Sequence, residues 1–345
     1  MCSEKIIQAV SCLNLDLKNK VVLTEAATGA YAVTAVIAAL AGAKVFAYTQ
    51  DTKYGSVADV KRDMFNLIDN FNIKNLNIEI IDKLDENIIS QLDIITNSGH
   101  LRPLNEEKLR YAKDSLVIPL MYEAWEWREA DLDLEYCRKR GFRIGATNER
   151  HPDVDVFSYL GDMALRLIFD SGKCLYKNKF VLICNNDFGP FIAKTLALIC
   201  NLLGVIDTLE NKDKYPSNVK WLCEFPEIKI PDEFIDADAI LFTAYPFDKI
   251  WIGDESSPIP LQSIVKSFST PFLLRYCGDI DTKAFTENNV PFYPVNVKSG
   301  HMGILPSDIG FDPIIRLQAA GLKVGECLLN NTFIYNGIKI LDFIK

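Results

Sequence analysis

A histidine lies in the stretch NVKSGHMGILP, between a segment typical of a strand and one typical of a helix. This residue, His301, is one of only three histidines in the chain, and Gly300 and Gly303 flank it. An imidazole exchanges protons near neutral pH, so a histidine on an open turn is suited to general acid–base catalysis. We expect His301 to be the catalytic acid or base; a solvated side chain without a role is the alternative.

Arg275 is a second residue whose type suits chemistry. It lies in LLRYCGDID, in a segment with the hydrophobic pattern of a strand. A guanidinium can form two parallel hydrogen bonds to a substrate carboxylate, or it can polarise a carbonyl. We expect Arg275 to act together with His301, and a surface ion pair is the alternative.

Polar and aromatic residues also follow strand-like segments in the first half of the chain. His100 ends the stretch LDIITNSGH, and His151 follows FRIGATNER. Glu123 and Trp125 lie in MYEAWEWRE, where aromatic rings could stack on a sugar or another ring. We expect these four residues to line a substrate cleft. Packing between lobes is the alternative for the aromatic cluster, and a helix start is the alternative for His151.

The elements that position these residues alternate between strand and helix. From Lys20 the chain reads as a strand (KVVLT), a turn (EAATGA), a helix (YAVTAVIAALAGA) and a second strand (KVFAYTQD). The stretches IEIID, LDIITNSGH, SLVIPLMYE and FRIGATN continue the series with helical segments between them. This alternation predicts a parallel sheet that helices cover on both faces.

The same pattern then begins again. KNKFVLI echoes KNKVVLT, and Gly189 occupies the turn that matches Gly29. We predict an α/β protein with two Rossmann-like, doubly wound lobes, crossover helices between them and a central cleft. The first lobe covers 1–152 and the second 153–311, while 312–345 packs back on the first and carries a hairpin turn at Asn336 and Gly337.

Ligands of such sheets bind beyond the carboxyl ends of the strands. In the first lobe this places Thr28 and Gly29 in the cleft, and Asp51 after the second strand would allow this lobe to hold a nucleotide. In the second lobe the turn CNNDFGPFIA takes the place of the dinucleotide fingerprint. The expected cofactor is NAD or NADP, held by Asn185, Asn186, Asp187, Phe188, Gly189, Glu210 and Tyr245, with Asp207 as the alternative to Glu210.

Composition limits the classes of partner. The formal charge of −9 argues against nucleic-acid binding, and a small-molecule substrate is expected instead. Nine cysteines without a C-x-x-C pair favour free thiols and no zinc site. The start lacks the pattern of a signal peptide, and the longest apolar run is too short to span a bilayer. We expect a cytoplasmic protein, with a homodimer as one assembly.

The layout resembles that of the D-isomer-specific 2-hydroxyacid dehydrogenases and their formate/glycerate dehydrogenase-like relatives. The stretch LDLEYCRKRGFRIGATNERHPDVDVFSYLGDMALRLIF is similar to their approach to the interdomain helix, and YKNKFVLICNNDFGPFIAKTLALICNLLGV to the start of their nucleotide-binding domain. NVKSGHMG is similar to their catalytic histidine turn, and Arg275 lies close to their substrate-binding arginine. The resemblance implies an NAD(P)-dependent oxidoreductase in which His301 exchanges a proton with the substrate as hydride moves to or from the nicotinamide.

Two other functions remain open. One is a nucleotide-sugar enzyme of the two-Rossmann-lobe glycosyltransferase type, and the other is a non-catalytic ligand-binding relative that kept the fold. Dinucleotide binding at Asn185 to Gly189 would favour the oxidoreductase, and nucleotide-sugar binding would favour the transferase. Ligand binding without turnover would favour the third.

Overall fold

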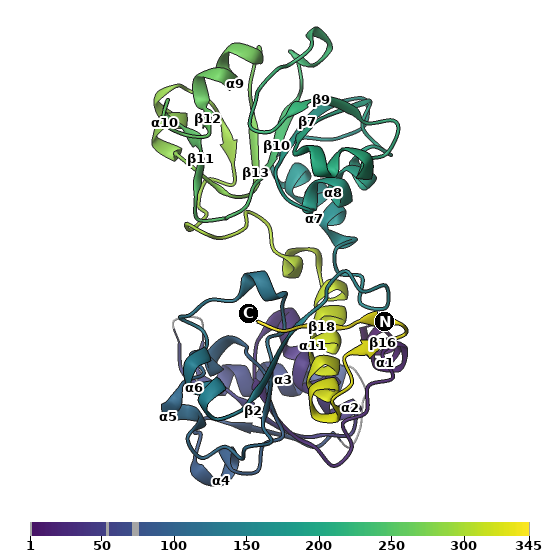
Figure 1. The fold of residues 1–345 in the computed structure, drawn as a ribbon, viewed down its shortest axis with the longest axis vertical. Coiled ribbons are helices and arrows are strands. Elements are labelled where there is room, and N and C mark those ends of the chain that lie inside the picture. The colour runs from purple at the N-terminus through teal and green to yellow at the C-terminus, as the bar shows by residue number, and fades with distance from the viewer. Residues whose placement is uncertain (1, 53–54, 71–75, 345) are drawn as a thin grey trace. The chain divides into compact units, whose positions relative to one another are not determined.

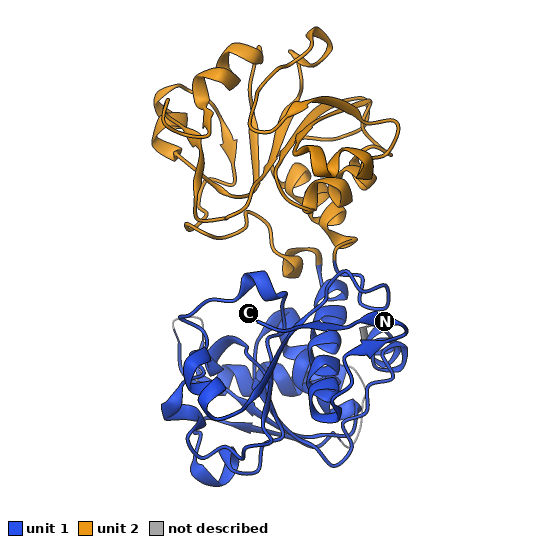
Figure 2. Cartoon of the chain, viewed as in Figure 1, with its two compact units in different colours: residues 1–156, 310–345 blue, residues 157–309 orange. Residues whose placement is uncertain are grey.

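The computed structural model describes residues 2–52, 55–70 and 76–344. The chain forms two compact units, which Figure 2 colours separately. Unit 1 is Met1–Val156 together with Gly310–Lys345, and unit 2 is Phe157–Ile309. The first unit is therefore built from both ends of the chain.

Unit 1 contains a 7-stranded sheet in the order β18-β6-β5-β4-β1-β2-β3. All neighbouring strands are parallel except β18, which pairs antiparallel with β6. The strands are β1 (Val21–Glu25), β2 (Lys44–Tyr48), β3 (Ile78–Ile81), β4 (Ile94–Ile95), β5 (Val117–Pro119), β6 (Arg143–Thr147) and β18 (Leu341–Asp342).

Helices cover both faces of this sheet (Figure 1). One core contains residues of α1 (Cys2–Cys12), α2 (Val33–Leu40), α3 (Val57–Asn70) and α11 (Asp312–Asn330). The other contains residues of α4 (Glu86–Ile89), α5 (Glu106–Leu109) and α6 (Leu134–Lys139). Three short 3₁₀ helices follow strands: η1 (Gly29–Ala32), η2 (Gly99–Leu101) and η3 (Ala124–Glu126). Apolar side chains on both faces explain the nearly continuous hydrophobic runs of the strands.

Unit 2 contains a 6-stranded parallel sheet in the order β15-β13-β10-β7-β8-β9. Its strands are β7 (Lys179–Cys184), β8 (Leu202–Asp207), β9 (Lys220–Glu224), β10 (Ala239–Thr243), β13 (Leu273–Cys277) and β15 (Phe292–Tyr293). A small sheet adds β11 (Ile250–Gly253), β12 (Ile259–Pro260) and β14 (Asp279–Ile280). The helices are α7 (Tyr159–Asp170), α8 (Phe188–Leu196), α9 (Leu261–Ser267) and α10 (Thr282–Glu287), with η4 (Leu209–Lys214), η5 (Asp232–Phe234) and η6 (Pro306–Ile309).

The two units share one strand order. Numbered along the chain within each unit, the parallel strands follow the doubly wound order 3-2-1-4-5-6. One contact is also repeated: Asp93, before β4, accepts a hydrogen bond from the Val21 amide at 2.8 Å, and Asp238, before β10, accepts one from the Lys179 amide at 2.8 Å. The predicted α/β class with two Rossmann-like units is confirmed.

The predicted hairpin near the C-terminus is also confirmed. β16 (Ile334–Tyr335) and β17 (Ile338–Lys339) pair antiparallel around Asn336 and Gly337, whose φ angles are 47° and 82°. β18 then adds to the edge of the unit 1 sheet. The segment from Gly310 onward thus belongs to unit 1.

Within the described part of the chain, no helix has the length and apolar character needed to cross a bilayer.

Candidate functional site

The carboxyl ends of the unit 1 strands form the first candidate site. In a doubly wound sheet, ligands bind where the strand order reverses. In unit 1 that point lies between β1 and β4, because β1 pairs with β2 on one side and with β4 on the other. The residues that follow β1 and β4 are therefore the first to consider.

Glu25 and His100 meet at this point. The ring nitrogen Nε2 of His100 lies 3.6 Å from Oε1 of Glu25, and the His100 backbone amide donates a hydrogen bond to the same oxygen at 3.2 Å. Gly99 allows this approach, because a Cβ at that position would overlap the Glu25 carboxylate. The side chains of His100 and Glu25 are 25% and 17% exposed, respectively. A carboxylate thus holds an imidazole that solvent and small molecules can reach.

Hydroxyl groups lie beneath this pair. The Thr96 hydroxyl donates a hydrogen bond to the buried Thr24 hydroxyl at 2.9 Å and lies 2.7 Å from the Ser98 hydroxyl. Thr24 and Thr96 are fully buried on β1 and directly after β4. Because a hydroxyl can both donate and accept, this row can adjust its proton positions to a polar ligand.

Asn97, Arg102 and Tyr122 form a second polar group beside the pair. The Asn97 side-chain amide donates to the Tyr122 hydroxyl at 2.8 Å, and Arg102 donates to the Asn97 backbone oxygen at 2.8 Å through Nη2. The Arg102 guanidinium also lies over the Tyr122 ring, 5.2 Å from its centre, and 3.4 Å from Asp131. Burial raises the pKa of Tyr122 to about 12, so its hydroxyl stays protonated at neutral pH.

Glu123 lies shortly after β5, and the backbone between them is strained at Met121. Met121 has a φ of 67°, which side chains of its kind rarely adopt, and a Cβ at Gly321 of α11 would overlap its sulfur. The Glu123 carboxylate accepts hydrogen bonds from Arg150 at 2.9 Å and 3.0 Å and from the Trp125 indole at 2.5 Å. Strained backbone of this kind concentrates at functional sites.

Three carboxyl groups gather here: Glu123, Glu126 and Glu149. The Glu123 amide donates to Glu126 Oε1 at 3.1 Å. Burial raises the pKa of Glu126 to about 7, and the charge of Glu123 adds to the rise. Burial also raises the pKa of Glu149 well above its ordinary value, as do the charges of Glu126 and Glu123. The cluster therefore retains a proton at neutral pH.

Unsatisfied polar atoms also mark this edge. Among the described residues, the buried side-chain polar atoms without a hydrogen-bond partner are Thr49 Oγ1, Trp127 Nε1 and Thr147 Oγ1. Thr49 directly follows β2, Trp127 follows η3, and Thr147 ends β6. Each such atom costs about 1–3 kcal/mol, and natural proteins keep few of them. All three belong to unit 1.

Thr28 and Gly29 lie at the turn between β1 and η1, where Thr28 is exposed. Gly29 has a φ of 62°, and a Cβ added there would meet nothing within 4 Å. Asp51 is exposed beyond β2, where it accepts a hydrogen bond from the Val57 amide at 2.7 Å. This turn is open to solvent.

The corresponding edge of unit 2 is closed by its own side chains. The Asn185 amide spans from β7 to β10: its nitrogen donates to the Tyr245 carbonyl at 3.1 Å, and its oxygen accepts from the Tyr245 amide at 2.8 Å. The Asn186 amide nitrogen donates to the Thr243 hydroxyl at 3.3 Å. These contacts join the two strands between which the order reverses.

Asp207, at the end of β8, is fully buried. Its carboxylate accepts hydrogen bonds from the Thr208 amide at 2.6 Å, the Tyr215 hydroxyl at 2.5 Å and the Asn211 amide at 3.1 Å. Burial raises its pKa to about 6, which these hydrogen bonds partly oppose. Asp207 therefore does not fit the ribose of a dinucleotide as it stands, because the ribose-binding carboxylate of a Rossmann domain must be accessible.

The other expected cofactor residues lie around this closed turn. Glu210 is exposed on η4, and Asp187 lies 3.5 Å from the ammonium of Lys214 on the same short helix. Phe188 is buried in the core on which α8 packs. The Tyr245 side chain is 44% exposed, and its contact with Asn185 is made by its backbone.

Arg275 lies in a buried network of unit 2. Its side chain is 4% exposed and forms an ion pair with Asp279. It also donates to the Gly278 carbonyl at 3.0 Å and to the Val297 carbonyl at 3.4 Å. Burial lowers the pKa of the guanidinium, and Asp279 opposes this. Its Nε, Nη1 and Nη2 atoms thus all take part in contacts inside unit 2.

His301 lies on the turn that this ion pair supports. Asp279 accepts hydrogen bonds from the Ser299 hydroxyl and from the Gly300 amide, the latter at 3.2 Å. The Gly303 amide donates to the Tyr276 carbonyl at 2.7 Å. The His301 side chain is exposed, and within the described residues no carboxylate lies within ion-pair distance of its ring. The structure thus pairs His100, not His301, with a carboxylate.

His151 is buried in unit 1. Its ring is 1% exposed, Nδ1 accepts from the Asp153 amide at 3.2 Å, and Nε2 lies 3.0 Å from the Tyr335 carbonyl. The ring joins the end of the unit 1 sheet to the C-terminal hairpin.

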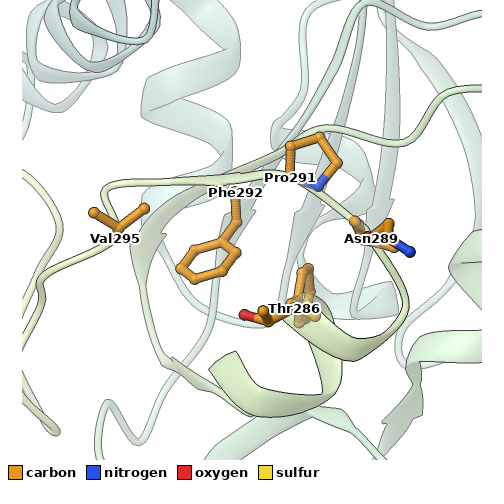
Figure 3. A pocket seen from close by; sticks show the side chains of 7 residues that line it. Thr286, Asn289, Pro291, Phe292 and Val295 are labelled. Carbon is orange, nitrogen blue, oxygen red and sulfur yellow. The ribbon is translucent and has the colours of Figure 1, made fainter.

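A pocket of about 510 Å³ lies elsewhere in unit 2 (Figure 3). It is lined by apolar and uncharged residues of α10, β15 and their connection: Phe285, Thr286, Asn289, Val290, Pro291, Phe292 and Val295. No titratable group is among these lining residues, so the pocket offers no acid–base chemistry.

No family model matches the sequence, and no curated protein does. Solved structures match it in fold. A dipicolinate synthase polypeptide from Bacillus halodurans has a TM-score of 0.56 at 11% identity, covering 92% of this chain and 98% of that chain. NAD-dependent formate dehydrogenase from Staphylococcus aureus, in complex with NAD, has a TM-score of 0.53 at 14% identity, covering 93% and 98%.

A D-lactate dehydrogenase from Treponema pallidum has a TM-score of 0.52 at 10% identity, covering 94% of this chain and 99% of that one. This chain has the fold of the two-domain Rossmann dehydrogenases. The likeness that the sequence suggested is thereby confirmed for the fold. At these identities, the comparison carries no further than the fold.

Several residues of the site were missed at the level of sequence: Glu25, Asn97, Arg102, Glu149 and Asp279. Glu25 is the last residue of β1, and its position at a strand end was the available signal. Asp279 lies four residues after Arg275, but that spacing does not reveal that β13 ends within the interval and that Gly278 follows it with a φ of 90°. The hydrogen bond from Asn97 to the Tyr122 hydroxyl joins positions 25 apart, a pairing that a single sequence does not reveal.

Proposed function

We propose that this chain is an enzyme that transfers a proton to or from a small polar substrate at the carboxyl edge of unit 1. His100 is the acid–base group, and Glu25 is the carboxylate that orients it. The observation that carries the proposal is the Glu25–His100 pair, with its 3.6 Å contact, at the point where the strand order reverses.

The surroundings suit this role. The imidazole is partly exposed, so a substrate can reach it, while the Gly99 backbone fixes its distance from Glu25. Further hydrogen-bonding groups come from residues shortly before His100 in the sequence. They are the hydroxyls of Thr96 and Ser98 and the side-chain amide of Asn97. A substrate with hydroxyl or carbonyl oxygens matches such a lining.

A matched pair of variants tests the assignment. We expect His100→Gln to lower turnover by about 100-fold or more, on the order of the contribution of an acid–base group. His301→Gln should leave the turnover rate within about twofold of that of the parent protein, measured with the same substrate. The substrates are small hydroxy acids, keto acids and sugars, first screened for a ligand-induced rise in melting temperature. The opposite ranking of the two variants would reject the proposal.

NAD(P)-dependent hydride transfer is a second candidate, and the fold supports it, because the Staphylococcus aureus neighbour is a complex with NAD. When bound, the dinucleotide would supply or accept the hydride. The closed turn at Asn185 and the buried Asp207 do not fit it as they stand. Calorimetric titration with NAD, NADH, NADP and NADPH tests this candidate. Silence from all four would remove it without affecting the role of His100.

A further inference from the structure

We infer that the strand-order reversal of unit 2 does not bind a dinucleotide, because the chain's own side chains take up the positions and hydrogen bonds that the ligand would use. This edge is an internal brace that stabilises unit 2. The inference is independent of the reaction proposed for unit 1.

The first support is the bridge over the reversal point. In a doubly wound domain, the ligand lies outside the carboxyl ends of the two strands that flank this point. In unit 2 these are β7 and β10. The Asn185 side chain directly after β7 forms two hydrogen bonds to the Tyr245 backbone beyond β10, at 2.8 Å and 3.1 Å. The amide thus spans the opening that a ligand would enter.

The second support is the saturation of Asp207. A carboxylate at the end of the second strand recognises ribose through lone pairs that face the ligand. Here one oxygen of Asp207 accepts from the Thr208 amide, and the other accepts from Asn211 and Tyr215. The Tyr215 phenol and the Asn211 amide therefore donate the hydrogen bonds that ribose hydroxyls would donate. Asp207 itself is fully buried.

The third support is the packing around the first turn of α8. A Cβ at Gly189 would overlap the Tyr215 hydroxyl and would lie 2.7 Å from the sulfur of Cys184. Asn211 of η4 also donates to the Asn186 carbonyl at 3.2 Å, and Lys214 lies 3.5 Å from Asp187. The segment from Asp207 to Tyr215 is thus fastened against the turn that precedes α8.

Hydrogen–deuterium exchange of the full chain, with and without saturating NADH and NADPH, tests this inference. We expect no change in exchange for peptides that cover 184–190, 207–215 and 243–246, whether or not other peptides respond. Protection of these three segments by either dinucleotide would overturn the inference. Protection confined to unit 1 would support it, since the dinucleotide would then bind elsewhere.

The variant Asn185→Ala tests whether the bridge forms in solution. Removing its two hydrogen bonds should speed exchange severalfold in 184–190 and 243–246 without any ligand. The matched control is Asn201→Ala, an exposed asparagine elsewhere in unit 2. Unchanged exchange in Asn185→Ala would mean that the edge is not braced by this amide, and it would contradict the inference. His100 is intact in both variants, so failure of this test is distinguishable from failure of the proposed reaction.

Discussion

Glu25 and His100 are separated by 75 positions in the sequence, and the His100 amide joins them at the reversal point of the unit 1 sheet, where Gly99 leaves room for the Glu25 carboxylate. One carboxylate oxygen accepts from the His100 amide and also lies 3.6 Å from its ring. The same oxygen therefore fixes both the backbone and the side chain of the histidine. The role proposed for His100 depends on this geometry. A substitution at Gly99 can disturb the geometry while both side chains stay as they are.

The variant Gly99→Ala should separate the pair at a modest cost in stability. Its methyl group would overlap the Glu25 carboxylate, which is the movable end of a flexible side chain. The positive φ of 38° adds strain of about 1–2 kcal/mol. We expect a loss of stability of this size, a shifted NMR resonance for the His100 ring and loss of the ligand response.

Gly141→Ala is the control for this experiment. Gly141 has a φ of 71°, but a Cβ there would meet nothing within 4 Å. It should lose about 1–2 kcal/mol, as expected for a left-handed residue, while the His100 resonance stays in place. Equal resonance shifts in the two variants would show that strain alone, and not the contact with Glu25, moves the ring.

Arg275→Gln should act on stability. The arginine forms an ion pair with Asp279 in which both side chains are buried, at 4% and 8% exposure, and removal of one partner strands the other charge. The expected loss is about 3–5 kcal/mol in the free energy of unfolding. Lys283→Gln breaks an exposed pair of the same spacing, at 82% and 63% exposure, and should change stability by less than about 1 kcal/mol.

Urea denaturation of both variants measures this difference. A parent-like stability for Arg275→Gln, combined with lost turnover, would restore the catalytic role expected from the sequence. The turn that holds His301 should also become more mobile in this variant, because Asp279 accepts hydrogen bonds from Ser299 and Gly300.

The fold could be predicted from the sequence more fully than the contacts of individual side chains. The fold was predictable because strands buried on both faces are hydrophobic throughout, and because glycine and asparagine mark the turns, as at Asn336 and Gly337. The importance of residues at strand ends followed from the same alternation, which brought His100 into consideration.

The pairing of those residues was not predictable. Arg275 lies within β13, where its side chain is buried, and nothing local to LLRYCGDID distinguishes that position from an exposed one. Asn185 lies in the turn that takes the place of the dinucleotide fingerprint, but its hydrogen bonds are to a backbone 60 positions away. Such contacts depend on the register and spacing of strands that are distant in sequence, and only coordinates supply these.

Glu126→Gln should change how stability depends on pH. Burial raises the pKa of this carboxyl from 4.5 to about 7 in the folded protein, so folding favours its protonated form. The resulting stability is fully present below pH 4.5 and is lost as the pH rises through about 7. We expect the parent to lose on the order of 1–3 kcal/mol over this window relative to Glu126→Gln, whose amide does not ionise.

The control for the pH experiment is Glu129→Gln, an exposed glutamate of the same loop. It should follow the parent curve. Asp207, whose pKa of about 6 acts with the same sign, is unchanged in both variants and cancels from the comparison. The difference between the curves therefore belongs to Glu126 and to Glu149, whose pKa the charge of Glu126 raises. Parallel curves for the parent and Glu126→Gln across this pH window would contradict the proton-retaining cluster.

Tyr215→Phe tests the buried carboxylate of unit 2 from its donor side. The phenol hydroxyl lies 2.5 Å from Asp207, which no solvent reaches, so its removal leaves a buried acceptor one donor short. The expected cost is about 1–3 kcal/mol, measured by thermal or urea unfolding. Tyr176→Phe removes a hydroxyl from a side chain that is 72% exposed and should cost less than about 0.5 kcal/mol. If the two variants are equally stable, water must replace the lost donor, and Asp207 must then be more accessible than its packing beneath Tyr215 indicates.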